Sequence, residues 1–152
     1  MLKIKQFDDF EVSKSTTVGE YQVTKEEIVE FAKKWDPQPF HIDEDTALRS
    51  PFKGLIACSA HIMAIAIRLM DSKETKTDII AGLGWNHVRF PNPVRAGDRL
   101  SATVECLTKR ESRSKPDRGI VRTQISVHNQ RGDVVVTYED TIMVAKKIAK
   151  PA

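Results

Sequence analysis

The chain has 152 residues, of which 40% are hydrophobic and 30% charged, and its formal net charge at pH 7 is +3. This size and composition predict a single globular domain over residues 1–152. So small a charge does not require a nucleic acid partner, and the N-terminus, MLKIKQFDDFEV, shows no apolar signal segment. The two cysteines lack the spacing of a disulfide framework or a zinc site, as is usual in a reducing compartment. We expect a cytoplasmic protein without a nucleic acid or membrane partner.

The first third of the chain predicts extended segments followed by a helix. Residues 1–23 read as short extended pieces with a bend at Gly19. Thr24 and Glu27 have the spacing of a capping box, which marks a helix start. Apolar residues then recur at helical spacing and form one face of that helix: Ile28, Phe31, Ala32 and Trp35.

Two prolines end this helix. Pro37 and Pro39 disfavour the helical conformation of the residues before them, so we expect a stiff, extended loop over residues 36–40. A further helical turn or two is predicted over 43–49, with Asp43 as its cap.

The rest of the chain predicts one buried helix and an antiparallel sheet. Residues 55–70 are apolar almost throughout, which indicates a helix buried on all sides. The pattern then changes to partial alternation, with Gly82-Leu-Gly84 as a bulge or a close backbone approach in a strand. Together with strand material near the N-terminus, this gives an α+β fold with one helix against the sheet. Four strands are predicted, over 79–90, 99–108, 119–129 and 133–145.

Asp36 and His41 are the candidate catalytic pair. They lie five residues apart on the proline-stiffened loop, and a carboxylate and an imidazole that converge can hold one water and move its protons. The alternative interpretation is structural: Asp36 caps a turn and His41 is an ordinary surface histidine.

Other titratable residues have simpler interpretations. His41 and Asp43 could begin an iron site completed by His87 or His128, although such sites usually occur in all-β folds. Cys58 could be a nucleophile, but a lone cysteine at the start of an apolar helix is more often a packing residue. His61 lies on the predicted buried helix, where a core or subunit contact is the simpler role.

Basic residues cluster in TKRESRSKPDRGIVR (108–122) and in KKIAK (146–150), which starts a basic tail over 146–152. The simpler interpretation is a solvated hairpin loop and a solubilising tail. The functional alternative is a phosphate-binding patch, for example for the nucleotide end of a coenzyme.

Three stretches resemble the MaoC-like dehydratases, the family of the (R)-specific enoyl-CoA hydratases. Its Asp-x-Asn-Pro-x-His signature is similar to WDPQPFHID (35–43). The segment that opens its central helix is similar to GLIACSAH (54–61), and its next strand–turn–strand unit to VRFPNPVRAGDRLSATVE (88–105). The resemblance extends from about residue 20 to 144. It implies a hotdog fold, in which an antiparallel sheet wraps a long central helix, and a homodimer or an assembly of dimers.

The same resemblance implies a function. Asp36 and His41 take the catalytic positions and activate a water that adds to a trans-2-enoyl-CoA, or to the thioester of an acyl carrier. The product is an (R)-3-hydroxyacyl thioester, and no metal or cofactor is implied. The oxyanion position falls on the backbone N–H of Ser59. We expect the substrate to contact Gln38, and also two further residues, Phe40 and Cys58.

Two features depart from the family pattern: Gln38 replaces the usual asparagine, and Cys58-Ser59 replaces a pair that usually ends in glycine. Both departures bear on the substrate class and the rate. Two alternative functions stay open beside the hydratase. One is a hotdog acyl-CoA thioesterase, and the other is a non-catalytic module that binds acyl thioesters.

Overall fold

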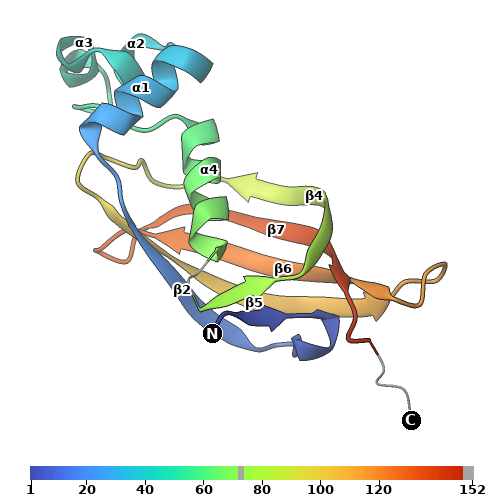
Figure 1. The fold of residues 1–152 in the computed structure, drawn as a ribbon. Helices are drawn as coiled ribbons and strands as arrows, with labels where there is room; N and C mark the ends of the chain where they lie inside the picture. The colour runs from blue at the N-terminus through green and yellow to red at the C-terminus, as the bar shows by residue number, and fades with distance from the viewer. Residues whose placement is uncertain (72–73, 149–152) are drawn as a thin grey trace.

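The computed structural model describes residues 1–71 and 74–148 (Figure 1). A five-stranded antiparallel sheet has the strand order β2-β5-β6-β7-β4, and β1 pairs in parallel with β3. The four predicted long strands are confirmed as β4 to β7, whereas the short β3 was not predicted. The elements in chain order are β1 (Lys3–Lys5), the 3-10 helix η1 (Phe7–Asp9), β2 (Ser15–Gln22), α1 (Lys25–Trp35), α2 (Pro39–Ile42), α3 (Glu44–Arg49), α4 (Ser59–Met70), β3 (Thr75–Thr77), β4 (Ile79–Arg89), β5 (Arg99–Glu111), β6 (Arg118–His128) and β7 (Val134–Ala145).

One face of the sheet packs against α4, and the three helices α1 to α3 gather beyond the N-terminal end of α4 (Figure 1). The main core joins α4 to the inner side chains of the strands and to Ile28 of α1. Burial of these apolar side chains is the main favourable contribution to folding. The largest of them that are fully buried are Tyr138, Ile28, Leu100 and Ile125.

The central helix is shorter and less buried than predicted. It begins at Ser59, because residues 55–58 are extended: Ile56 forms a bridge with Arg95, and the Ala57 N–H donates to the Val94 carbonyl at 2.9 Å. One stripe of α4 faces away from the sheet, and its Ile67 is 52% exposed. The expectation of burial on all sides is therefore wrong for the single chain.

The proline loop also differs from the prediction. Only residues 36–38 are extended, because Pro39 begins the short helix α2 and Phe40 continues it. Proline is well suited to a first helical position, where its missing N–H is not needed and its φ is already helical. Further along, Asp43 caps α3 as predicted, by accepting the Thr46 N–H at 2.9 Å.

Only half of the predicted capping box forms at α1. The Thr24 hydroxyl accepts the Glu27 N–H at 3.2 Å. The Glu27 side chain points elsewhere, toward Tyr21 of β2 and His61 of α4.

The predicted glycine irregularities are confirmed. Gly19 has φ +68°, and the register of β2 against β5 shifts between Val18 and Tyr21. The pairing of β4 with β7 shifts between Gly82 and Gly84. Such shifts bend a strand and increase its twist.

A second, smaller core lies under the N-terminal segment. Phe7 of η1 covers β6 so closely that a Cβ on Gly119 would lie 2.3 Å from its ring. The C-terminal side of the chain closes over the same segment, where the Lys147 N–H donates to the Asp8 carboxylate at 2.8 Å. The buried members of this second core are Phe7, Phe10, Cys106, Val121, Ile142 and Val144.

Candidate active site

Asp36 follows directly on the last turn of α1. Its N–H donates to the Ala32 carbonyl at 2.9 Å, and its own carbonyl accepts the Gln38 N–H at 2.8 Å. Its backbone has left the helical conformation, with φ −153° and ψ 76°. The helix and the following proline thus fix the direction in which the half-buried Asp36 side chain leaves the chain.

His41 lies on α2 and is only 5% exposed, so it is not the surface histidine of the alternative interpretation. Its Nδ1 is 2.6 Å from the Ile56 carbonyl oxygen. A carbonyl only accepts hydrogen bonds, so Nδ1 carries a proton. In the neutral imidazole, Nε2 then holds a free lone pair, which can accept a proton.

The two predicted catalytic groups converge. Nε2 of His41 lies 3.7 Å from Oδ2 of Asp36, which is too long for a direct hydrogen bond. A water oxygen can lie within hydrogen-bonding distance of both atoms. The Asp36 side chain is 38% exposed and the His41 side chain 7%. Solvent therefore reaches the position of such a water from the side of Asp36.

Both groups open into a pocket of about 460 Å³. Gln38, Phe40 and Ser59 line the same pocket, so most of the predicted site residues lie together. Cys58 is absent from the lining, and its side chain is buried beside it. Burial also raises the pKa of the Cys58 thiol, which disfavours the reactive thiolate and argues against a nucleophilic role.

Ser59 is the first residue of α4. The first intrahelical bond of this helix runs from the Ile62 N–H to the Cys58 carbonyl at 3.1 Å, so the Ser59 N–H has no intrahelical acceptor. The helix dipole adds partial positive charge at the same end. This end of α4 therefore suits an oxygen that gains negative charge during a reaction.

Sequence reasoning missed one wall of the pocket. The connection after β4 supplies Phe90, Pro91, Asn92 and Pro93, and the segment before α4 supplies Phe52. In the sequence, Pro91-Asn92-Pro93 indicates only a turn between two strands. Its fixed position comes from a long-range bond, since the Asn92 amide donates to the Val134 carbonyl at 2.8 Å.

The described residues do not form the alternative iron site. Across 1–71 and 74–148, no group of three or more His, Cys, Asp and Glu side chains could hold a metal ion. His128 instead contacts the Thr103 hydroxyl at 2.8 Å.

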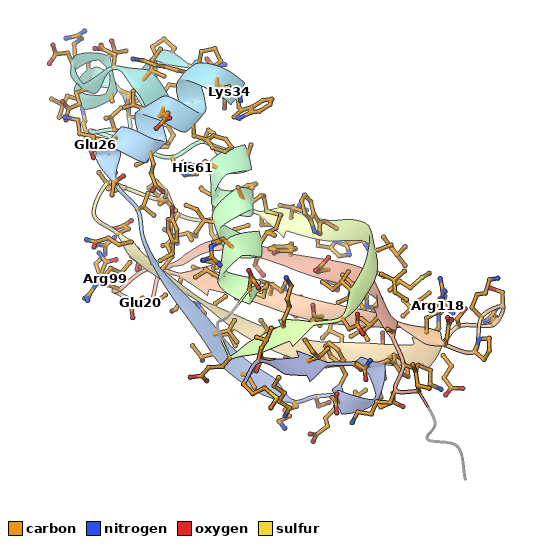
Figure 2. All side chains as sticks on the ribbon, in the orientation of Figure 1. Glu20, Glu26, Lys34, His61, Arg99 and Arg118 are labelled. Carbon is orange, nitrogen blue, oxygen red and sulfur yellow. The ribbon has the colours of Figure 1, made fainter. Side chains whose placement is uncertain are left out.

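The basic cluster lies on the β5–β6 hairpin, and Figure 2 shows Arg118 far along the sheet from His61. Arg118 pairs locally with Asp117 at 2.8 Å, and Lys146 with Glu111. The last residues of the predicted basic tail, 149–152, are outside the described part.

Comparison with known proteins identifies the family. Residues 9–129 match the MaoC like domain family, so the chain belongs to it. A Bacillus subtilis protein, "Uncharacterized protein YdeM", is 32% identical over 93% of this chain and 99% of its own length. The 3-hydroxyacyl-thioester dehydratase Z of Mycobacterium tuberculosis is 36% identical, over 53% of this chain and 56% of its own length.

Solved structures agree with this family and show that the fold is a hotdog fold, as predicted. A MaoC-like dehydratase from Rhodospirillum rubrum matches with a TM-score of 0.86 and 34% identity, over 95% of this chain and 99% of its own. The (R)-hydratase PhaJ1 from Pseudomonas aeruginosa matches with a TM-score of 0.74 and 25% identity, over 97% and 93% of the two chains. These relatives support an activity of the hydratase or dehydratase kind.

Among the described helices, none combines the length and the hydropathy needed to cross a membrane.

Proposed function

We propose that the protein hydrates trans-2-enoyl-CoA thioesters to (R)-3-hydroxyacyl-CoA thioesters and catalyses the reverse dehydration. The observation that carries this proposal is the arrangement at His41: Nδ1 is bound to the Ile56 carbonyl, and Nε2 lies 3.7 Å from the Asp36 carboxylate. That arrangement leaves one basic nitrogen and one carboxylate oxygen to hold a single water in the pocket.

The reaction then follows from these groups. Nε2 of His41 takes one proton from the water as its oxygen bonds to C3 of the enoyl group. Asp36 accepts a hydrogen bond from the other hydrogen, which stays on the oxygen and becomes the product hydroxyl. The electrons of the double bond move toward the thioester carbonyl, and its oxygen accepts a hydrogen bond from the Ser59 N–H. The protonated His41 then returns its proton to C2, which regenerates the neutral imidazole and restores the neutral thioester. Gln38 and Phe40 line the same pocket and are available to contact the substrate.

A panel of trans-2-enoyl-CoA substrates of increasing chain length tests the proposal. Hydration removes the absorbance of the conjugated thioester without releasing free thiol. A thioesterase would release thiol, and a non-catalytic binding module would leave both signals unchanged while binding the thioester. Either of these results would overturn the proposal. Chiral analysis of the hydroxyacyl product then tests the (R) configuration.

We also infer that the protein is a homodimer joined at β4. This strand is at an edge of the sheet, and several of its large apolar side chains are about half exposed: Ile79 53%, Ile80 43%, Leu83 48% and Trp85 49%. A long apolar edge strand invites aggregation unless something covers it. A second copy paired across a two-fold axis covers both edges at once.

A further inference from the structure

A second polar cluster joins α1 to α4 outside the lining of the candidate active site. Nε2 of His61, on α4, is 3.2 Å from Oε1 of Glu27, on α1. The Tyr21 hydroxyl of β2 donates to the other Glu27 oxygen at 3.0 Å. Phe31 stacks on the His61 ring, with centroids 4.6 Å apart and planes at 8°. Figure 2 shows His61 at the end of α4 that faces α1.

This cluster is costly for the fold. His61 is 5% exposed, and burial lowers the pKa of its imidazole despite the nearby Glu27 carboxylate. Nδ1 of His61 is buried without a hydrogen-bond partner within residues 1–71 and 74–148, and Oε1 of Glu27 has only the 3.2 Å approach of His61 Nε2. An unsatisfied buried polar atom costs about 1–3 kcal/mol, whereas two apolar groups of the same shape are often neutral in their place. Packing alone therefore does not explain the pair.

The positions of the two residues suggest a role at the active site, although neither residue lines its pocket. Glu27 belongs to α1, and Asp36 is the residue that follows the last turn of α1. His61 belongs to the first turn of α4, two residues after Ser59. Each partner is thus rigidly joined to one half of the site: Glu27 to the carboxylate and His61 to the backbone N–H.

We propose that Glu27 and His61 are positioning residues, whose contact fixes α1 against α4 and so sets where the Asp36–His41 water lies relative to the Ser59 N–H. The proposal rests on the proposed hydratase function. Hydration needs the water at C3 and the hydrogen-bond donor at the thioester carbonyl oxygen at the same moment. A displacement of one helix by about 1 Å costs up to 10²-fold in rate. A polar contact has a preferred direction and distance, whereas apolar side chains can slide against each other.

Two variants separate positioning from packing. Glu27→Gln keeps the size of the side chain and removes its charge. The double variant E27L/H61F replaces the pair by apolar side chains and keeps an aromatic ring on Phe31. The hydroxyl of the half-buried Tyr21 then exchanges its Glu27 acceptor for water. Glu44→Gln is the control, because Glu44 of α3 pairs with Lys25 of α1 at 2.5 Å on the exposed surface.

The measurement is kcat and KM for a trans-2-enoyl-CoA, with the thermal unfolding midpoint of each variant. We expect E27L/H61F to unfold at or above the wild-type temperature, yet to show a kcat about 10- to 10²-fold lower with KM little changed. Glu27→Gln should also lower kcat, and Glu44→Gln should have the kcat and KM of the wild type.

Wild-type kcat in both pair variants would overturn the positioning role while leaving the hydratase intact. A loss of kcat that only parallels a loss of folded protein would also overturn it. An inactive wild type would instead remove the proposed function, and the inference with it.

Discussion

His41 donates a hydrogen bond from Nδ1 to the Ile56 carbonyl at 2.6 Å, across fifteen residues of sequence. This bond joins α2 to the extended segment that leads into α4. It fixes the tautomer of His41 and the distance between His41 and the start of α4 together. The groups of the candidate site therefore share one rigid frame.

The first prediction concerns Asp36 and His41. Asp36→Asn and His41→Ala each remove one of the two groups that hold the water, so each should lower kcat by about 10²–10⁴-fold. The measurement is the loss of enoyl-thioester absorbance, with circular dichroism to verify the fold. His128→Gln, a histidine away from the pocket, is the matched control and should retain activity. Near wild-type turnover in either site variant would refute the assignment.

The second prediction separates the backbone of Ser59 from its hydroxyl. Ser59→Ala keeps the N–H and should keep most of the activity. Ser59→Pro deletes the N–H at the first position of α4, where proline is tolerated. Loss of one such donor costs about 2.7–4 kcal/mol, so the proline variant should fold but react about 10²–10³-fold more slowly. The reverse ranking in steady-state kinetics would show that the hydroxyl does the chemistry.

The third prediction is a pH dependence of stability. Burial lowers the pKa of His61 in the folded state, whereas the unfolded value is about 6.5. Between the two values the unfolded chain binds more protons, so the free energy of unfolding rises with pH there. The His61 contribution is complete above about pH 6.5 and is lost as the pH falls toward the folded-state value. In urea unfolding, the free energy of unfolding should fall less between pH 7 and pH 5 in E27L/H61F than in the wild type. The same pH dependence of the free energy of unfolding in both proteins would contradict a lowered pKa of His61.

The fourth prediction concerns the β4 edge. The wild type should sediment as a dimer, or an assembly of dimers, at micromolar concentration. Leu83→Lys puts a charge on the exposed β4 edge and should shift the equilibrium between dimer and monomer toward the monomer. Leu48→Lys on α3 is the control, since Leu48 is 58% exposed and lies outside β4. A monomeric wild type would show that another molecule, or none, covers this strand.

The strands and helices were readable from local pattern, since alternation and helical spacing reflect which face each segment buries. The start of α4 was harder to locate, because Cys58 is not among the side chains that usually cap helices. Asp36 and His41 were found because they lie five residues apart in sequence, around two prolines. The Ile56 carbonyl and the pocket wall over residues 90–93 were missed, because long-range contacts to backbone carbonyls bring them to the site. A backbone acceptor carries no residue identity that a pattern could detect.

The packing of Phe7 on Gly119 has a practical consequence for anyone who trims the chain. The family match begins at residue 9, yet Phe7 is only 5% exposed and belongs to the second core. A fragment cut to the family boundary would lose this aromatic ring and leave the β6 glycine facing water. Fusion partners and truncations should therefore leave residues 1–10 intact, even though the proposed chemistry lies at the other end of the sheet.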